Sequence, residues 1–269
     1  MKRIPSLAGA VLRLLLVLVA CVPFWFLLVT ALSRPEWRSL FVPELYWANL
    51  AVAWQKSALG RAMANSLAIT VGAVLLVVGA SASAGFAFAR IPNRFHKTVY
   101  HAFLLSMMVP AIINTVPLYV LMRRIHGVNT LWAMILLLAT GAIPFASFLY
   151  TGFIGGMSRE VEESAYLEGC TWFSAFWRVV FPLLKPVTAS VIILNGISIW
   201  NNYAAAVFFL QKRERYTVPL AISGFVQTYG ADWNLMAAAA VIGLLPAVSV
   251  FLLFQRHFTK GITAGSVKG

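Results

Sequence analysis

Long apolar runs alternate with short polar segments along the whole chain. The runs cover approximately residues 12–32, 65–89, 99–122, 131–153, 187–210 and 236–254. Each run supplies the roughly 20 apolar residues that a helix needs to cross a bilayer. The pattern therefore predicts an all-α, polytopic membrane protein, with six transmembrane helices in a single transmembrane domain of residues 1–269.

The composition supports a membrane protein and excludes most soluble classes. Hydrophobic residues make up 61% of the chain and charged residues 11%, too few charges to cover the surface of a soluble domain. The net charge of +13 comes from short basic groups between apolar runs, a pattern typical of loops that face anionic lipid. We therefore expect lipid rather than nucleic acid as a partner. Cys21 and Cys170 show no metal or disulfide spacing, so no metal site is expected.

The first run and the basic residues bear on orientation. A signal peptide has an apolar core of about 7–15 residues, and the core here is longer, which favours an uncleaved first helix. An even number of spans places both termini on one side. Basic residues are slightly more numerous on that side, so the positive-inside rule favours cytoplasmic termini and a cytoplasmic tail at 258–269. The aromatic external segments, 33–61 and 211–235, fit either an interfacial belt or a docking surface.

The polar segment between the fourth and fifth runs, 158–186, predicts two short helices joined by a turn. Ser158 is the expected N-cap of the first helix, and the acidic residues that follow it favour a helix start. Gly169 can adopt the left-handed conformation that ends this helix. Thr171 can cap the second helix, and Pro182 falls near its end. Taken alone, these residues also fit an amphipathic hairpin whose aromatic side chains lie in lipid.

The same segment carries a motif made of Glu163, Ser164, Ala165, Glu168, Gly169, Cys170, Phe176, Pro182 and Pro186. It resembles the EAA loop of ATP-binding-cassette (ABC) importer permeases, with mild departures at Ser164, Glu168 and Cys170. In that family the loop docks into a cytoplasmic ATPase subunit. The resemblance implies the ATPase-coupling residues Glu163, Ser164, Ala165, Glu168, Gly169, Phe176 and Pro182.

Further motifs resemble the carbohydrate-importing members of this family. They lie at residues 65–67, 85–90, 108–110, 116–119, 129–130 and 198–203. The segment 261–269 resembles the tail of the smaller permease subunit of the maltose importer, which reaches between the ATPase subunits. This implies ATPase contacts through Thr263, Ala264, Gly265 and Lys268, although a polar, Gly-rich terminus is also typical of a plain disordered tail.

The resemblance implies a type I ABC importer permease fold in a bacterial inner membrane and import of a sugar or oligosaccharide by alternating access. The implied partners are a second, homologous permease, an ATPase dimer and an extracytoplasmic solute-binding protein. The chain has no Walker A loop, so we expect ATP and Mg²⁺ in the ATPase and no cofactor bound directly. It is expected to be a transport subunit rather than an enzyme.

Polar residues inside the predicted spans are candidates for the substrate path, because a polar group facing lipid is costly. These are Asn114, Tyr119, Asn195, Trp200, Asn201, Asn202 and Tyr203. Amides beside aromatic rings suit a neutral polyhydroxylated solute, whereas each Asn could equally bond a neighbouring helix. The pattern does not name the sugar and leaves a solute such as glycerol phosphate open.

Two other classes have weaker support. An intramembrane enzyme would have to use His101 and Ser106, but residues five apart on a helix point to different faces. An ATP-independent transporter or channel would need intramembrane carboxylates or a filter motif. The 8 acidic residues all lie outside the centres of the predicted spans.

Overall fold

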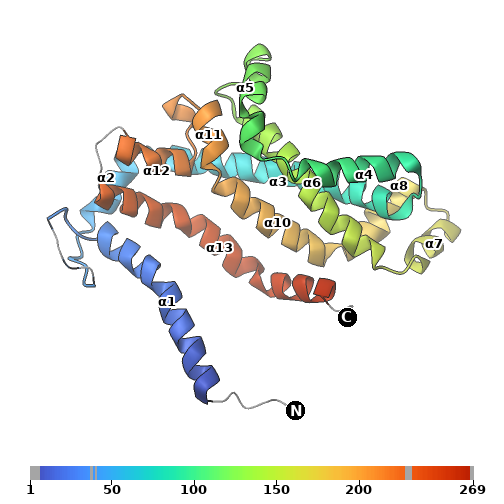
Figure 1. Cartoon of the computed structure of the whole chain (residues 1–269), viewed down its shortest axis with the longest axis horizontal. Coiled ribbons are helices and arrows are strands. Elements are labelled where there is room, and N and C mark those ends of the chain that lie inside the picture. The colour runs from blue at the N-terminus through green and yellow to red at the C-terminus, as the bar shows by residue number, and fades with distance from the viewer. Residues whose placement is uncertain (1–6, 37–38, 40, 228–231, 267–269) are drawn as a thin grey trace. The chain divides into compact units, whose positions relative to one another are not determined.

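The computed structural model describes residues 7–36, 39, 41–227 and 232–266. Every regular element within these ranges is helical. The chain divides into two compact units: residues 1–63 with 218–245, and residues 64–217 with 246–269. Figure 1 shows the helices of both units, which we describe one unit at a time.

The first unit joins the start of the chain to a segment near its end. Its elements are α1 (Leu7–Ala31), α2 (Ala48–Lys56), α12 (Val218–Gln227) and the first parts of α3 (Leu59–Arg90) and α13 (Trp233–Ser266). The Nδ2 groups of Asn49 and Asn234 each donate two hydrogen bonds, one to a carbonyl at the end of α1 and one to the carbonyl of Ser33 just after it, at 2.7–3.0 Å. The last carbonyls of a helix have no hydrogen-bond partner within the helix, and the amides of Asn49 and Asn234 act as donors to them.

The second unit contains the remaining helices and both regions of functional interest. Besides most of α3, it includes α4 (Arg94–Ser106), η1 (Ala111–Asn114), α5 (Thr115–Arg124), α6 (Leu131–Gly155), α10 (Lys185–Trp200), α11 (Tyr203–Phe209) and η3 (Arg213–Arg215). Helices α3 and α6 approach closely at Gly85. A Cβ added to this glycine would lie 2.5 Å from the Cβ of Tyr150. The Tyr150 hydroxyl donates to Thr188 Oγ1 at 3.0 Å, which ties α6 to α10.

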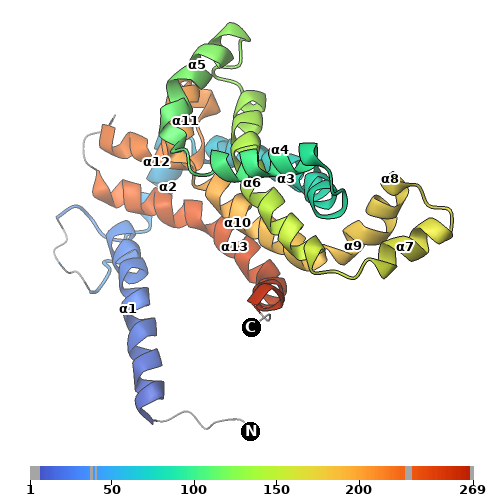
Figure 2. The same cartoon turned by 45° about the vertical axis from the view of Figure 1, so that its right-hand side comes forward.

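Between α6 and α10 the chain forms a helical hairpin. It consists of α7 (Glu160–Leu167), α8 (Trp172–Ala175), the π-helical turn η2 (Phe176–Val180) and α9 (Phe181–Leu183). In Figure 2 this hairpin lies beyond the adjoining ends of α6 and α10. A bend of 76° separates the segment Trp172–Leu183 from α10.

The apolar runs correspond to helices of different lengths and continuity. Among the described residues, 3 helices are long and apolar enough to cross a membrane, or up to 5 if each bent pair is one span. The run 99–122, expected as one span, is broken between α4 and η1 by a bend of 100°. Pro110 lies at this break, where its missing N–H cannot continue a helix.

The run 187–210 is likewise interrupted, at Asn201 and Asn202. The segment Trp233–Ser249 is apolar but shorter. The number of spans stays a prediction.

Candidate functional site

The turn of the hairpin depends on a glycine in the left-handed region. Gly169 has a φ of +85°, and nothing lies within 4 Å of where its Cβ would be. Its N–H donates to Tyr166 O, and the N–H of Cys170 donates to Ala165 O, both at 3.0 Å. These two bonds form a Schellman motif, which satisfies carbonyls at the end of α7. The left-handed conformation predicted for Gly169 is confirmed.

The capping residues of the hairpin agree with the prediction at one helix and differ at the other. Thr171 Oγ1 accepts the N–H of Ser174 at 3.3 Å, which confirms it as the cap of α8. The expected N-cap Ser158 is wrong by one residue: α7 begins at Glu160, and the N-cap position is Arg159. Ser158 Oγ still accepts the N–H of Glu160 at 3.3 Å, so it supports the start of the helix from one position further back.

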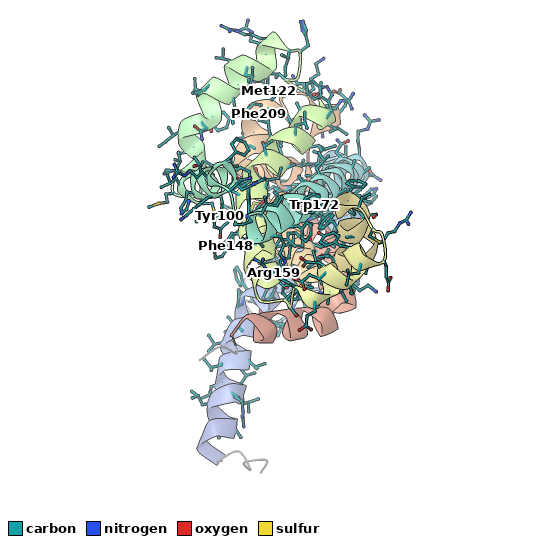
Figure 3. All side chains as sticks on the ribbon, turned by 90° about the vertical axis from the view of Figure 1, so that its right-hand side faces the viewer. Tyr100, Met122, Phe148, Arg159, Trp172 and Phe209 are labelled. Atoms are coloured by element: carbon teal, nitrogen blue, oxygen red, sulfur yellow. The ribbon has the colours of Figure 1, made fainter. Side chains whose placement is uncertain are left out.

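The hairpin has a packed face and an exposed face. Of the predicted coupling residues, Ala165 and Phe176 are buried, while Glu163, Ser164, Glu168, Gly169 and Pro182 are exposed. Two apolar side chains also project outward, with Leu167 90% and Phe173 69% exposed. Figure 3 views this end of the second unit, with Arg159 and Trp172 labelled on the two arms. The exposed face combines carboxylates with apolar side chains, a combination suited to a protein partner.

Aromatic rings hold the packed face of the hairpin against α3. Phe86 is fully buried, and its ring centroid lies 4.9 Å from that of Trp172 and 5.0 Å from that of Phe176. Trp177 extends the cluster, with its ring 4.9 Å from Phe176 and 5.0 Å from Phe181. The cluster buries large apolar surfaces, which is the main stabilising term for such a contact.

An ion pair that the sequence did not indicate joins α7 to the end of α3. Arg90 Nε lies 2.8 Å from Glu162 Oε1, with the two side chains only 8% and 6% exposed. The Nη2 of Arg90 also donates to Met157 O at 3.1 Å. Burial and the neighbouring Glu162 carboxylate raise the pKa of Tyr166, while Arg90 lowers it. The sequence predicted a coupling role for the adjacent Glu163 and none for Glu162. Glu162 lies three residues before Ala165, on the same face of the helix, and this spacing was the one sign that Glu162 is buried.

A cavity of about 670 Å³ lies within the second unit. Its walls come from the end of α4, η1, the start of α5, α6, α10 and α11. The polar side chains among the lining residues are Ser106, Asn114, Thr115, Thr140, Asn195, Ser198 and Asn202, and Phe145 and Phe209 add aromatic rings. No charged side chain is among the lining residues. The volume is in the range of small-molecule sites, and the lining offers amides, hydroxyls and ring faces.

Three of the predicted substrate-path residues meet at this cavity. Asn195 is 5% exposed and donates one Nδ2 hydrogen to Val191 O at 2.9 Å, which leaves its carbonyl oxygen and its second N–H for a solute. Asn202 caps α11 by accepting the N–H of Ala205 at 2.9 Å, so its amide N–H groups can face a solute. Asn114 lies at the end of η1. The cavity therefore presents both donors and acceptors.

The other predicted substrate-path residues do not line the cavity: Tyr119, Trp200, Asn201 and Tyr203. Tyr119 instead receives a hydrogen bond from Gln211 Nε2 at 3.3 Å, and Asn201 Nδ2 donates to Ile197 O at 3.0 Å. The hydroxyls of Ser106 and Thr140 were missed. Each donates to its own helix backbone, at 2.7 Å and 2.8 Å, a bond that Ser and Thr form in most apolar helices. No sequence signal separated them from ordinary helix residues.

The remaining candidates have ordinary local positions. Thr263, Ala264 and Gly265 belong to α13, which runs to Ser266, and Lys268 lies outside the described residues. His101 Nδ1 lies 2.6 Å from Lys97 O, one turn back on its own helix. No group of three or more His, Cys, Asp or Glu that could hold a metal occurs in the described part of the chain.

Comparison with known proteins agrees with this architecture. Residues 77–264 match the family model described as binding-protein-dependent transport system inner membrane component. The melibiose/raffinose/stachyose import permease protein MelC of Bacillus subtilis (strain 168) is 34% identical, over 96% of each chain. The diacetylchitobiose uptake system permease protein DasC of Streptomyces coelicolor (strain ATCC BAA-471 / A3(2) / M145) is 29% identical, over 88% of this chain and 85% of the relative.

The fold is also that of a solved transporter chain. The match is to a crystal structure of a bacterial ABC transporter involved in the import of the acidic polysaccharide alginate, with a TM-score of 0.82. It covers 93% of this chain and 95% of the other at 20% identity. The all-helical permease fold predicted from the sequence is confirmed. With its fold, its hairpin between α6 and α10 and its relatives in agreement, the chain belongs to the family of binding-protein-dependent transport system inner membrane components, the permeases of ABC importers.

Proposed function

We propose that this permease carries a neutral sugar or oligosaccharide through the cavity between α4, α6, α10 and α11. The uncharged lining of the cavity is the observation that carries the proposal. A sugar presents hydroxyls that need both donors and acceptors, together with C–H faces that pack on aromatic rings. The amides of Asn195 and Asn202 and the rings of Phe145 and Phe209 supply these groups. An anionic solute would lose its hydration here without gaining a cation.

The names of the relatives support the same class of substrate. MelC is described as importing melibiose, raffinose and stachyose, and DasC as taking up diacetylchitobiose. All of these are uncharged oligosaccharides. The alginate importer, whose substrate is acidic, shares the fold at only 20% identity and so does not bear on the substrate here.

Transport requires partners that supply energy and substrate. The exposed face of the hairpin, with Glu163, Glu168 and Leu167, is proposed to dock on a cytoplasmic ATPase dimer that binds ATP and Mg²⁺. A second, homologous permease would complete the pathway, and an extracytoplasmic binding protein would deliver the solute. In this arrangement both termini are cytoplasmic, and the C-terminal segment contacts the ATPase through Thr263, Ala264, Gly265 and Lys268.

The docked hairpin is the element through which the ATPase would move the helices of the permease. Closure of the ATPase dimer on ATP would displace the docked hairpin, and the helices of the permease would shift between inward- and outward-open states. The substrate site is then reached from alternate sides of the membrane. Proline residues such as Pro144 within α6 allow bends whose released backbone groups are satisfied inside the bundle.

Uptake by cells that lack only this chain tests the proposed substrate. Radiolabelled raffinose is the probe, with excess unlabelled glycerol phosphate or a uronic-acid oligosaccharide as competitor. We expect raffinose uptake only when the chain is restored, and no inhibition by either anion. Restored uptake of an anionic solute, with no uptake of neutral oligosaccharides, would overturn the proposal.

A further inference from the structure

The end of α3 contacts three other elements of the second unit. Residues 85–90 contain three contacts: Gly85 packs on α6, Phe86 packs on α8 and η2, and Arg90 pairs with Glu162 of α7. The sequence motif at these positions had no assigned role. Its residues contact both the hairpin and α6.

The two contacts with the hairpin hold different arms of it. Phe86 and Arg90 are four residues apart, so they project from the same face of α3. Phe86 holds the arm of α8 and η2 through two ring contacts, and Arg90 holds α7 through the buried ion pair. A hairpin attached at both arms cannot pivot about one of them while α3 stays still. Displacement of the hairpin therefore has to move the end of α3.

The ion pair is a stiff connection. Arg90 Nε donates to Glu162 Oε1 at 2.8 Å, and Arg90 Nη2 donates to Met157 O at 3.1 Å, so the guanidinium is fixed in two directions. Both side chains are more than nine-tenths buried. Removal of one partner would leave an unpaired charge in a site with little water, so the pair resists separation.

Contacts continue from α3 to the cavity. The absence of a side chain on Gly85 lets α3 lie directly on Tyr150, which is itself fully buried in α6. The Tyr150 hydroxyl donates to Thr188 of α10 at 3.0 Å. Helices α6 and α10 then line the cavity with Thr140 and Asn195. A contiguous set of packed groups thus runs from the hairpin to the cavity wall, as the transmission of a displacement requires.

We propose that residues 85–90 are the joint through which a displacement of the hairpin moves the helices around the cavity, with Arg90 and Glu162 as positioning residues for transport. This inference rests on the proposed function of the hairpin as the ATPase-docking element. It separates two roles within the hairpin: the exposed face binds the ATPase, and the buried face transmits its movement.

The test uses the complete transporter, with its ATPase and second permease, in proteoliposomes loaded with ATP. The variants are Glu162→Gln, the double neutral variant Arg90→Gln/Glu162→Gln, and the swap Arg90→Glu/Glu162→Arg. Arg94→Gln is the matched control, since it removes an arginine charge from an exposed position at the start of α4, outside the hairpin. Three quantities are measured: capture of the ATPase, ATP hydrolysis, and solute transported per ATP hydrolysed.

We expect Glu162→Gln and the double neutral variant to capture the ATPase and hydrolyse ATP, while solute transported per ATP falls about tenfold. The control should match the wild type, and the swap should recover part of the lost coupling. The recovery is the readout that a purely structural role of either residue alone would not produce.

The proposal that residues 85–90 act as a joint is overturned if the double neutral variant transports as much solute per ATP as the wild type. It is also overturned if ATPase capture, ATP hydrolysis and transport are lost in parallel. The proposed docking function fails in a different way, when the wild-type chain itself captures no ATPase. The two failures are therefore distinguishable.

Discussion

At the scale of single residues, residues of the same type that lie close together in the sequence have opposite roles. Glu162 is buried against Arg90, whereas the adjacent Glu163 is exposed. Asn195 lines the cavity, whereas Asn201 lies outside it. The difference is one of helical phase, since each residue along a helix turns the side chain by about 100°. These pairs provide matched variants in which only the position differs.

Gly169 allows charge and backbone strain to be separated. A Cβ there meets open space, so the cost of Gly169→Ala is conformational, about 1–2 kcal/mol for a left-handed residue. Asn tolerates this conformation better than Ala. We expect Gly169→Asn to retain ATPase capture and uptake, and Gly169→Asp to lose them, because the acid adds a charge to the exposed turn. Equal, wild-type-like uptake by the Asn and Asp variants would show that the turn does not contact the partner.

A substitution at Asn195 tests whether the solute passes through the cavity. We expect Asn195→Leu to lower uptake of a neutral oligosaccharide about tenfold, because a buried hydroxyl left without a partner costs about 1–3 kcal/mol. Asn201→Leu is the control, because it changes the same group outside the cavity. Initial uptake rates over a range of solute concentrations make the comparison. Equal rates in the two variants would remove Asn195 from the substrate path.

At the scale of elements, the sequence predicted local backbone features better than it predicted bends and buried pairs. Gly169 and Thr171 were identified because turn and cap preferences act within a few residues. The 100° bend between α4 and the segment formed by η1 and α5 was not, since a proline in an apolar run fits a mild kink as well as a break. The Arg90–Glu162 pair was missed because its partners are 72 residues apart and meet only through packing.

The two faces of the hairpin should respond differently to mutation. Leu167→Asp changes a side chain that is 90% exposed, so we expect thermal stability in detergent to stay unchanged while ATPase capture is lost. Phe176→Ala removes a buried ring from the aromatic cluster and should cost about 3–5 kcal/mol of stability. Thermal unfolding and capture are measured on both. Loss of stability in Leu167→Asp, or normal capture by it, would contradict the division of faces.

At the scale of the whole molecule, the fold and family are established, whereas orientation in the membrane is a prediction. Its basis is the proposed docking of the hairpin on a cytoplasmic ATPase, together with the slight excess of basic residues on the side of the termini. The hairpin and the loop after α11 should then face opposite sides of the membrane. Each offers a suitable position for a thiol, at Cys170 and at the exposed Gln211.

A membrane-impermeant thiol reagent tests this orientation in the chain expressed without the ATPase. With Cys21→Ala, only Cys170 remains, and we expect it to react in inverted vesicles and not in right-side-out ones. With both native cysteines replaced by Ala and Gln211→Cys added, the pattern should reverse. Labelling of Cys170 from the outside would place the hairpin on the wrong side for an ATPase.

The central claim is that the hairpin couples this permease to an ATPase, and a pull-down in detergent tests it most directly. Tagged wild-type chain is compared with a variant in which residues 160–176 are replaced by a neutral linker, using the ATP-binding subunit encoded nearest this chain. Both chains are first matched for monodispersity. We predict that only the wild type retains the ATPase. Equal retention by the linker variant would contradict the account, because the ATPase would then be held elsewhere.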